Sequence, residues 1–177
     1  MTPDAELTAA DLAGMLRLPA TAPSTSTSCR PEAVTVSLMF SDAAMGHRYG
    51  VLTVVNDSSE ACSVQGYPGI GARGGWGSTF QLAAEQRDPI APSATQDEVM
   101  LAPGGSAVAN MEWTGELAGA QSEPISLLVV QLTTDGEVIG HPVSAESTGI
   151  PEPDTGIDIG MMTTVRVGPL QPESASA

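Results

Sequence analysis

Hydrophobic and polar residues alternate along much of this chain with the two-residue period of β-strands. Between residues 33 and 40, Val34, Val36 and Leu38 share one face and Thr35 and Ser37 the other, which predicts a half-buried strand. No long stretch of residues 29–168 shows a helical period. Further strands are predicted at residues 49–55, 62–65, 99–101, 106–113, 125–132 and 156–167.

Turn-forming residues separate these strands. The segments 56–59 (NDSS), 66–69 (GYPG) and 103–105 (PGG) are rich in residues that favour tight turns. The glycine-rich stretch at residues 74–77 and the stretch at residues 87–97 are expected to be surface loops. About seven short strands with this spacing predict an all-β fold, an antiparallel immunoglobulin-like β-sandwich.

The two ends of the chain have different patterns. Thr8 and Asp11 resemble a capping box ahead of three apolar residues at helical spacing, which favours a short N-terminal helix. Residues 20–28 (ATAPSTSTS) are small and polar, as is typical of a flexible spacer. The predicted organisation is an N-terminal segment and spacer over residues 1–28, a sandwich domain over 29–168 and a flexible tail over 169–177.

Composition and charge indicate which residues form the core and exclude two classes of binding partner. Aliphatic residues and methionine must form the core, because hydrophobic residues make up 41% of the chain but aromatic residues only 3%. The net charge is −15, and all six basic residues are arginine. We therefore expect no binding to nucleic acid or to an anionic membrane surface, both of which require clustered cations.

Cys29 and Cys62 give an indication of the cellular compartment in which the protein works. Cys29 opens the first predicted strand and Cys62 follows the second, so adjacent strands would bring them together, and a disulfide is favoured over two buried thiols. A disulfide indicates an exported protein. No apolar run is long enough to span a bilayer, and the first residues do not resemble a signal peptide. The expectation is a secreted or envelope protein whose export signal precedes this sequence.

Several blocks of sequence resemble a known family. These are residues 46–49 (GHRY), 52–56 (LTVVN), 62–69 (CSVQGYPG) and 101–107 (LAPGGSA), followed by Trp113. In this order they are similar to the secreted actinobacterial proteins catalogued as domain of unknown function 4232, many of which look like lipoproteins. The resemblance spans roughly residues 29–167.

The resemblance implies an immunoglobulin-like sandwich, the pairing of Cys29 with Cys62 and a lipid anchor in the precursor, but no activity. The chain lacks the second cysteine pair expected near Glu123 and in the last strand, so its C-terminal half is expected to be held by packing alone or to be looser. The residues that carry the resemblance are expected to be structural: Asn56, Gly66, Tyr67, Pro68, Gly69, Pro103, Gly104 and Trp113.

Two groups of residues suggest binding. Trp76 lies among glycines on a predicted loop, where an exposed ring is a candidate contact for a protein or a sugar. Met45 and His47 are weak candidates for a copper site, because thioether and imidazole suit copper(I). Core packing is the competing interpretation of the methionines, and no other metal or cofactor is expected.

Catalytic patterns do not stand out. The chain has no Gly-x-Ser-x-Gly, no His-Glu-x-x-His, no phosphate-binding glycine loop and no lysine. The leading hypothesis is a non-enzymatic, secreted or lipid-anchored envelope module that contacts a protein or a cell-wall component. The alternative hypothesis is an extracellular small-ligand or copper-binding protein that uses methionine and histidine.

Overall fold

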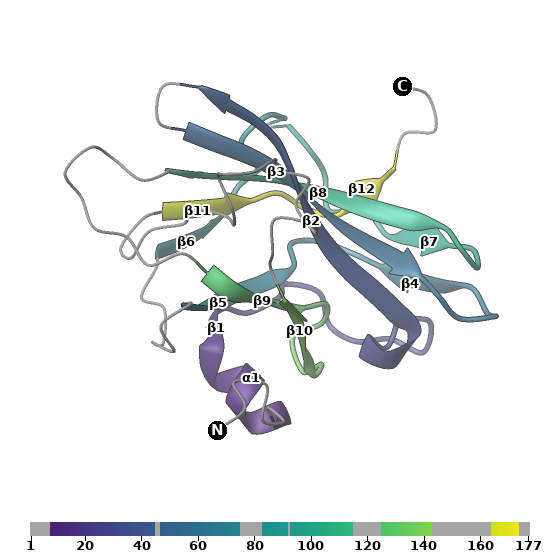
Figure 1. The fold of residues 1–177 in the computed structure, drawn as a ribbon. Coiled ribbons are helices and arrows are strands. Elements are labelled where there is room, and N and C mark those ends of the chain that lie inside the picture. The colour runs from purple at the N-terminus through teal and green to yellow at the C-terminus, as the bar shows by residue number, and fades with distance from the viewer. Residues whose placement is uncertain are drawn as a thin grey trace.

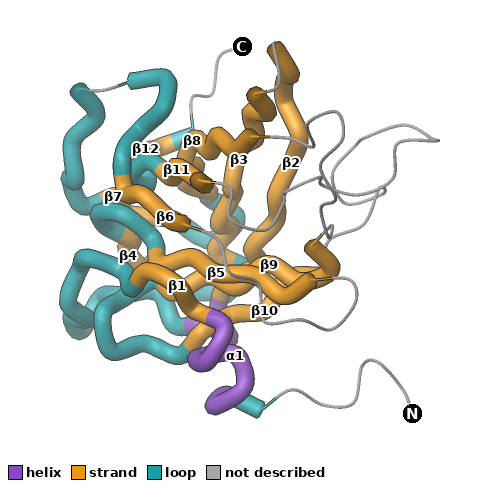
Figure 2. Tube along the Cα trace, turned by 90° about the vertical axis from the view of Figure 1, so that its left-hand side faces the viewer, coloured by secondary structure: helices purple, strands orange, loops and turns teal. Residues whose placement is uncertain are grey.

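In a computed structural model, the described residues form two larger β-sheets that pack face to face and a separate two-stranded pair (Figures 1 and 2). The structure describes residues 8–44, 47–74, 83–91, 93–114, 125–142 and 164–173. Within these residues no helix is long and apolar enough to cross a membrane.

The larger sheet has the strand order β2-β3-β8-β11-β6. Its strands are β2 (Val34–Ala44), β3 (His47–Asn56), β8 (Ser106–Thr114), β11 (Thr164–Val167) and β6 (Ala83–Gln86), and β12 (Gln171–Pro172) also pairs with β8. Most neighbours are antiparallel, but β11 and β6 are parallel. This pair departs from the purely antiparallel arrangement expected from the sequence.

The smaller sheet has the strand order β1-β5-β9-β10. It contains β1 (Leu16–Leu18), β5 (Gly69–Gly74), β9 (Ile125–Gln131) and β10 (Val138–Pro142). A separate antiparallel pair joins β4 (Cys62–Val64) to β7 (Val99–Leu101). Helix α1 (Ala9–Met15) lies on the outer side of the smaller sheet (Figure 2), and the 3-10 turn η1 (Pro31–Ala33) precedes β2.

The core lies between the two sheets because alternate residues of each strand point inward. On the larger sheet, β3 and β8 contribute Leu52, Val54, Met111 and Trp113, all buried. The smaller sheet contributes Leu128 and Val130 of β9 to the same cluster, together with Ile70 of β5. The apolar residues of the alternating pattern therefore face the core, and the residues between them face away from it.

Strand β9 is buried on both faces. Leu128 and Val130 face the core, whereas Leu127 and Val129 form a second cluster with Val138. Side chains of α1 and β1 cover this second cluster. A strand covered on both sides has no need for polar residues on either face, which explains the uninterrupted apolar run of residues 127–130.

Most predicted strands are present with small shifts in their ends, and the short helix is confirmed. Residues 156–163 of the last predicted strand and residues 75–77 of the predicted glycine-rich loop lie outside the described residues. Thr8 caps α1, and Thr8 and Asp11 form the reciprocal bonds of a capping box. The all-β class is confirmed, whereas the immunoglobulin-like topology stays a prediction. The described residues contain twelve strands rather than about seven, because β1, β5, β6, β10 and β12 had no clear sequence signal.

The described segments on either side of the predicted sandwich domain pack against the sheets. In residues 20–28, predicted as a flexible spacer, Ala20 and Ala22 are buried, and the Thr134 amide donates to the Ala22 carbonyl at 2.9 Å. At the other end Leu170 is fully buried, and Gln171 pairs with Val108 of β8. The paired region thus extends beyond Gly168, where the sequence pattern placed the end of the sandwich.

Candidate functional site

The Cys29–Cys62 disulfide joins the entry of β2 to β4. Its Cα atoms are 4.8 Å apart, and both residues are buried. Backbone bonds align the two segments, because the Cys29 amide donates to the Ser63 carbonyl and the Ser63 amide donates to the Thr27 carbonyl, both at 2.8 Å. The predicted pairing is confirmed.

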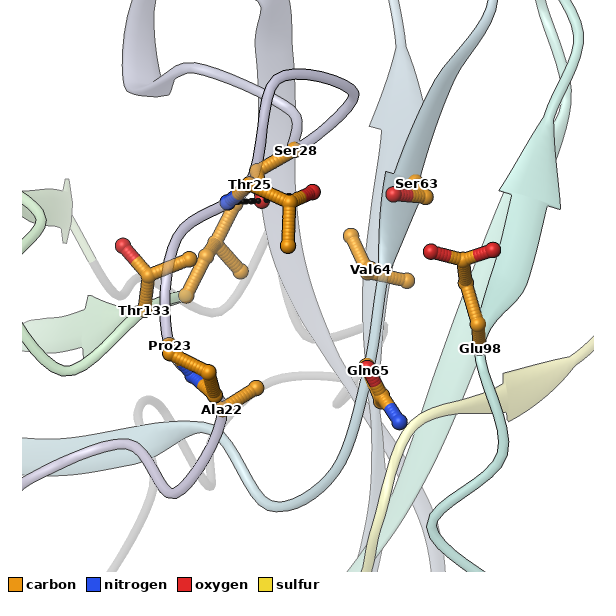
Figure 3. Close-up of a pocket in the computed structure, with 10 residues that line it drawn as sticks. Ala22, Pro23, Thr25, Ser28, Ser63, Val64, Gln65, Glu98 and Thr133 are labelled. Atoms are coloured by element: carbon orange, nitrogen blue, oxygen red, sulfur yellow. Dashed lines mark hydrogen bonds between the residues drawn. The ribbon is translucent and has the colours of Figure 1, made fainter.

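A polar pocket lies beside this disulfide (Figure 3). Hydroxyl groups of Thr25 and Ser28 line one side, and Ser63 and Gln65 line the other, with Glu98 nearby. The Thr25 amide donates to Ser28 Oγ at 2.8 Å. The cavity volume is about 10 Å³, which accommodates a single water molecule rather than an organic ligand.

A larger depression follows β7. Its volume is about 540 Å³, it is open to solvent, and residues 99–102, 105, 106, 172 and 173 line it. Met100 is 54% exposed there, whereas its neighbours Val99 and Leu101 are buried. Met100 of β7 lies opposite Ser63 of β4, but the backbone groups of Ser63 bond residues 27 and 29. Ser63 and Met100 are therefore a non-hydrogen-bonded pair of the antiparallel ladder. The backbone groups of Met100 therefore point away from β4.

Asn56 connects β3 to two turns. Its side chain is fully buried, and Nδ2 donates to the Glu60 carbonyl at 2.8 Å and to the Leu101 carbonyl at 3.0 Å. Oδ1 accepts from the Ser58 amide at 2.9 Å and from Ser58 Oγ at 2.7 Å. All four hydrogen-bonding positions of the amide are used, which gives Asn56 a structural role.

The segment 66–69 (GYPG) contacts described residues from both the N-terminal and the C-terminal part of the chain. Gly66 has a φ of 73°, a left-handed conformation that favours glycine. Its carbonyl accepts from the Leu170 amide at 2.9 Å, and the Tyr67 carbonyl accepts from the Thr21 amide at 3.1 Å. At Gly69 a Cβ atom would lie 2.7 Å from the Ala20 amide nitrogen, so only glycine lets this segment approach so closely.

Gly104 occupies the turn that faces Asn56. Its φ is 83°, and its amide donates to the Asn56 carbonyl at 2.8 Å, while the Asn56 amide donates to the Gly105 carbonyl at 2.9 Å. The two blocks of sequence that carry most of the resemblance, around Asn56 and around Gly104, are thus bonded to each other in the folded chain.

Charged side chains form a row on the outer face of the larger sheet. Arg166 Nη1 donates to Glu112 Oε1 at 2.8 Å, and Arg166 Nε lies 3.2 Å from Glu85 Oε2. His47 Nδ1 lies 3.5 Å from Glu112 Oε2. A histidine beside a carboxylate could transfer protons, but these residues line neither depression described above. The sequence did not indicate this row, because its members lie far apart along the chain.

A family model matches residues 29–171, most of the chain. The chain belongs to the domain of unknown function family DUF4232. Neither a curated protein nor a solved structure matches it. The DUF4232 match includes the disulfide, Asn56, the 66–69 segment and Gly104, whereas α1 and β1 precede it.

The remaining predicted site residues fall into two groups. Trp113 is buried in the core of the DUF4232 domain, and Pro103 lies in the turn after β7. His47 is half exposed and faces Glu112. Trp76 and Met45 lie outside the described residues, so the sugar-contact and copper interpretations stay predictions. In the described part of the chain, no group of three or more His, Cys, Asp or Glu residues is arranged to hold a metal.

Proposed function

We propose that this DUF4232 protein is a non-enzymatic binding module outside the cytoplasm, secreted or anchored by lipid at the cell envelope, with an immunoglobulin-like sandwich as its framework. The buried Cys29–Cys62 disulfide carries the proposal. Disulfides of this kind persist in oxidising compartments and are rare in the reducing cytosol.

The described surface supports binding of a large partner. The pocket beside the disulfide holds only about one water molecule, whereas the depression along β7 is broad and open. A shallow groove with an exposed methionine suits a protein segment or a polymer better than a small substrate, which is normally enclosed on most sides. The depression along β7 is therefore the proposed contact surface.

The compartment is tested by thiol labelling. Cells that make the protein are fractionated and alkylated before and after reduction, and the intact mass is measured. We expect the chain in the envelope or the medium, with no thiol alkylated before reduction. The Cys62→Ser variant should add one alkyl group at Cys29 and serves as the control. A cytosolic chain with two alkylated thiols would overturn the proposal.

The contact surface is tested by co-sedimentation of the purified chain with isolated cell envelopes. Met100→Asp is compared with Ile90→Asp, because both residues are exposed and apolar but only Met100 lines the depression. Met100→Asp should weaken binding about tenfold and Ile90→Asp should not. Equal binding by both variants contradicts the assignment of this surface. Turnover of an envelope polymer that is lost in His47→Ala contradicts the non-enzymatic role.

A further inference from the structure

The outer face of the smaller sheet has an apolar surface under α1 and β1. Leu127, Val129 and Val138 are 8%, 0% and 7% exposed, and the side chains packed on them are Leu12, Met15 and Leu16. This surface would lie open if residues 8–19, called the N-terminal segment below, moved away. We call the edge of β5 and these outer faces of β9 and β10 the outer docking surface.

Glycines shape this surface to accept a polypeptide backbone. Val129 pairs with Gly71 of β5 on one side and Gly140 of β10 on the other. A Cβ atom on Gly71 would lie 2.8 Å from Leu16 Cα, and one on Gly140 would lie 3.1 Å from Leu12 Cδ2. Side chains at positions 71 and 140 would fill the space that the N-terminal segment occupies. Glycine at both positions therefore lets another segment of chain approach the sheet closely.

The N-terminal segment is held less firmly than the surface it covers. Helix α1 has seven residues, none of them buried, and Gly14 within it has open space around its Cα. Strand β1 has three residues and an irregular register with β5. Short helices that contain glycine are marginal on their own, and weakly packed segments open most readily.

The two parts also differ in their relation to the family. Every strand of the outer docking surface lies within the DUF4232 match at residues 29–171, whereas the N-terminal segment precedes it. The apolar surface thus lies within the matched domain, and its cover lies outside the match.

We propose that the outer docking surface binds a protein segment in which a short amphipathic helix leads into a β-strand, and that the N-terminal segment occupies this surface in competition with such a partner. The partner would place two apolar residues of its helix on Val129 and Val138 and add its strand to β5, the two modes of contact that the N-terminal segment itself uses. This surface is distinct from the depression along β7, so the inference goes beyond the proposed function.

The experiment uses the full chain and a fluorescent peptide with the sequence of residues 8–19 as the probe. Leu12→Asp/Met15→Asp weakens the intramolecular contact of α1 and leaves the residues of the docking surface unchanged. Ala13→Asp places a single negative charge on an exposed position of α1 and is the control for charge on the helix. Gly14→Ala should strengthen α1, because a Cβ atom there meets nothing within 4 Å.

Trypsin reports release of the N-terminal segment, because Arg17 lies in β1 and the chain has no lysine. Cleavage after Arg17 should become about tenfold faster in the double variant and slower in Gly14→Ala. The probe should bind the double variant tightly, the wild type and Ala13→Asp weakly, and Gly14→Ala least. Adding Gly140→Val to the double variant should abolish binding of the probe.

Three outcomes overturn the proposal. In the first, the double variant is cut rapidly after Arg17 but does not bind the probe. In the second, Gly140→Val leaves binding unchanged. In the third, the wild type dimerises with Arg17 protected, which assigns the surface to exchange between copies of the chain. If the double variant does not fold, Leu12→Ala/Met15→Ala takes its place under the same criteria. Envelope binding through Met100 is measured separately and does not depend on these results.

Discussion

Replacing Asn56 gives the sharpest test of how the turns at residues 56–60 and 101–105 are held. The Asn56 amide makes four hydrogen bonds, and the one to the Leu101 carbonyl is buried. In Asn56→Ala that carbonyl loses a partner that water cannot easily replace, at about 1–3 kcal/mol, and the bonds near the surface contribute less. We expect a total loss of about 2–4 kcal/mol in the free energy of unfolding.

Asn56→Asp separates hydrogen bonding from size, because the side chains have nearly the same shape. The carboxylate can still accept from Ser58, but its second oxygen faces the carbonyl oxygens of Glu60 and Leu101, which Nδ2 now contacts at 2.8 and 3.0 Å. Repulsion and burial of the charge should make this variant less stable than Asn56→Ala by about 1 kcal/mol or more at neutral pH.

The pH dependence of Asn56→Asp has a definite sign. Burial raises the pKa of the new carboxyl group in the folded chain, so the unfolded chain loses its proton first as the pH rises. The variant should therefore be most stable below the unfolded pKa of about 3.9 and lose stability above it. Asn56→Ala lacks this dependence.

Denaturation by guanidinium under non-reducing conditions, followed by tryptophan fluorescence, measures these differences, since Trp113 is buried in the core. Ser59→Ala is the control, because Ser59 is exposed in the same turn. If Asn56→Asp at neutral pH matches Ser59→Ala to within about 0.5 kcal/mol, the bonding described for Asn56 is wrong.

Three further predictions follow from other contacts. Replacing both Cys29 and Cys62 by serine should lower the free energy of unfolding by about 3–4 kcal/mol in the same assay, because the disulfide closes a loop of 33 residues; an unchanged midpoint would contradict this. Gly50→Ala should destabilise the fold by about 1–3 kcal/mol, since its Cβ atom would lie 3.0 Å from the Met39 carbonyl oxygen and 3.1 Å from the Trp113 ring, whereas Gly104→Asn, which tolerates positive φ, should have a smaller effect. The backbone hydrogen bond from Thr8, and then its side-chain bond, lower the pKa of Asp11 below 3.8. The capping contribution is therefore present above 3.8 and is lost as the pH falls through the lowered pKa, and NMR titration of the Asp11 carboxyl group checks this direction.

Sequence reasoning succeeded where side chains determine the structure. Alternation over Val34–Leu38 located β2, and the Thr8 and Asp11 pair located α1, because each pattern depends on contacts within a few residues. Strand β5 was missed because its sequence, GIGARG, has low strand propensity, and its glycines are there to let the N-terminal segment approach. The need for glycine in β5 arises from residues about 50 positions earlier in the chain, so the sequence around β5 does not reveal it.

The sequence also did not predict that residues 20–28 are held in a fixed position on the sheets. Their position is fixed by backbone groups that bond distant partners, such as the Ala20 amide, which donates to Gln131 Oε1 at 3.0 Å. Bonds from a backbone leave no periodic pattern of side chains. The charged row of His47, Glu112, Arg166 and Glu85 was missed for a related reason, since strand order decides which of the acidic residues face an arginine.

The position of the disulfide has a mechanical consequence. A force applied at the N-terminus would first peel off α1 and β1, which are held only by non-covalent contacts. The force would then reach Cys29, where the covalent bond to Cys62 transfers the load to β4 and shields residues 30–61 between the two cysteines. In a chain tethered by its N-terminus, we expect stretching to release α1 and β1, whereas β2 and β3 lie inside the disulfide loop and bear no tension along the chain.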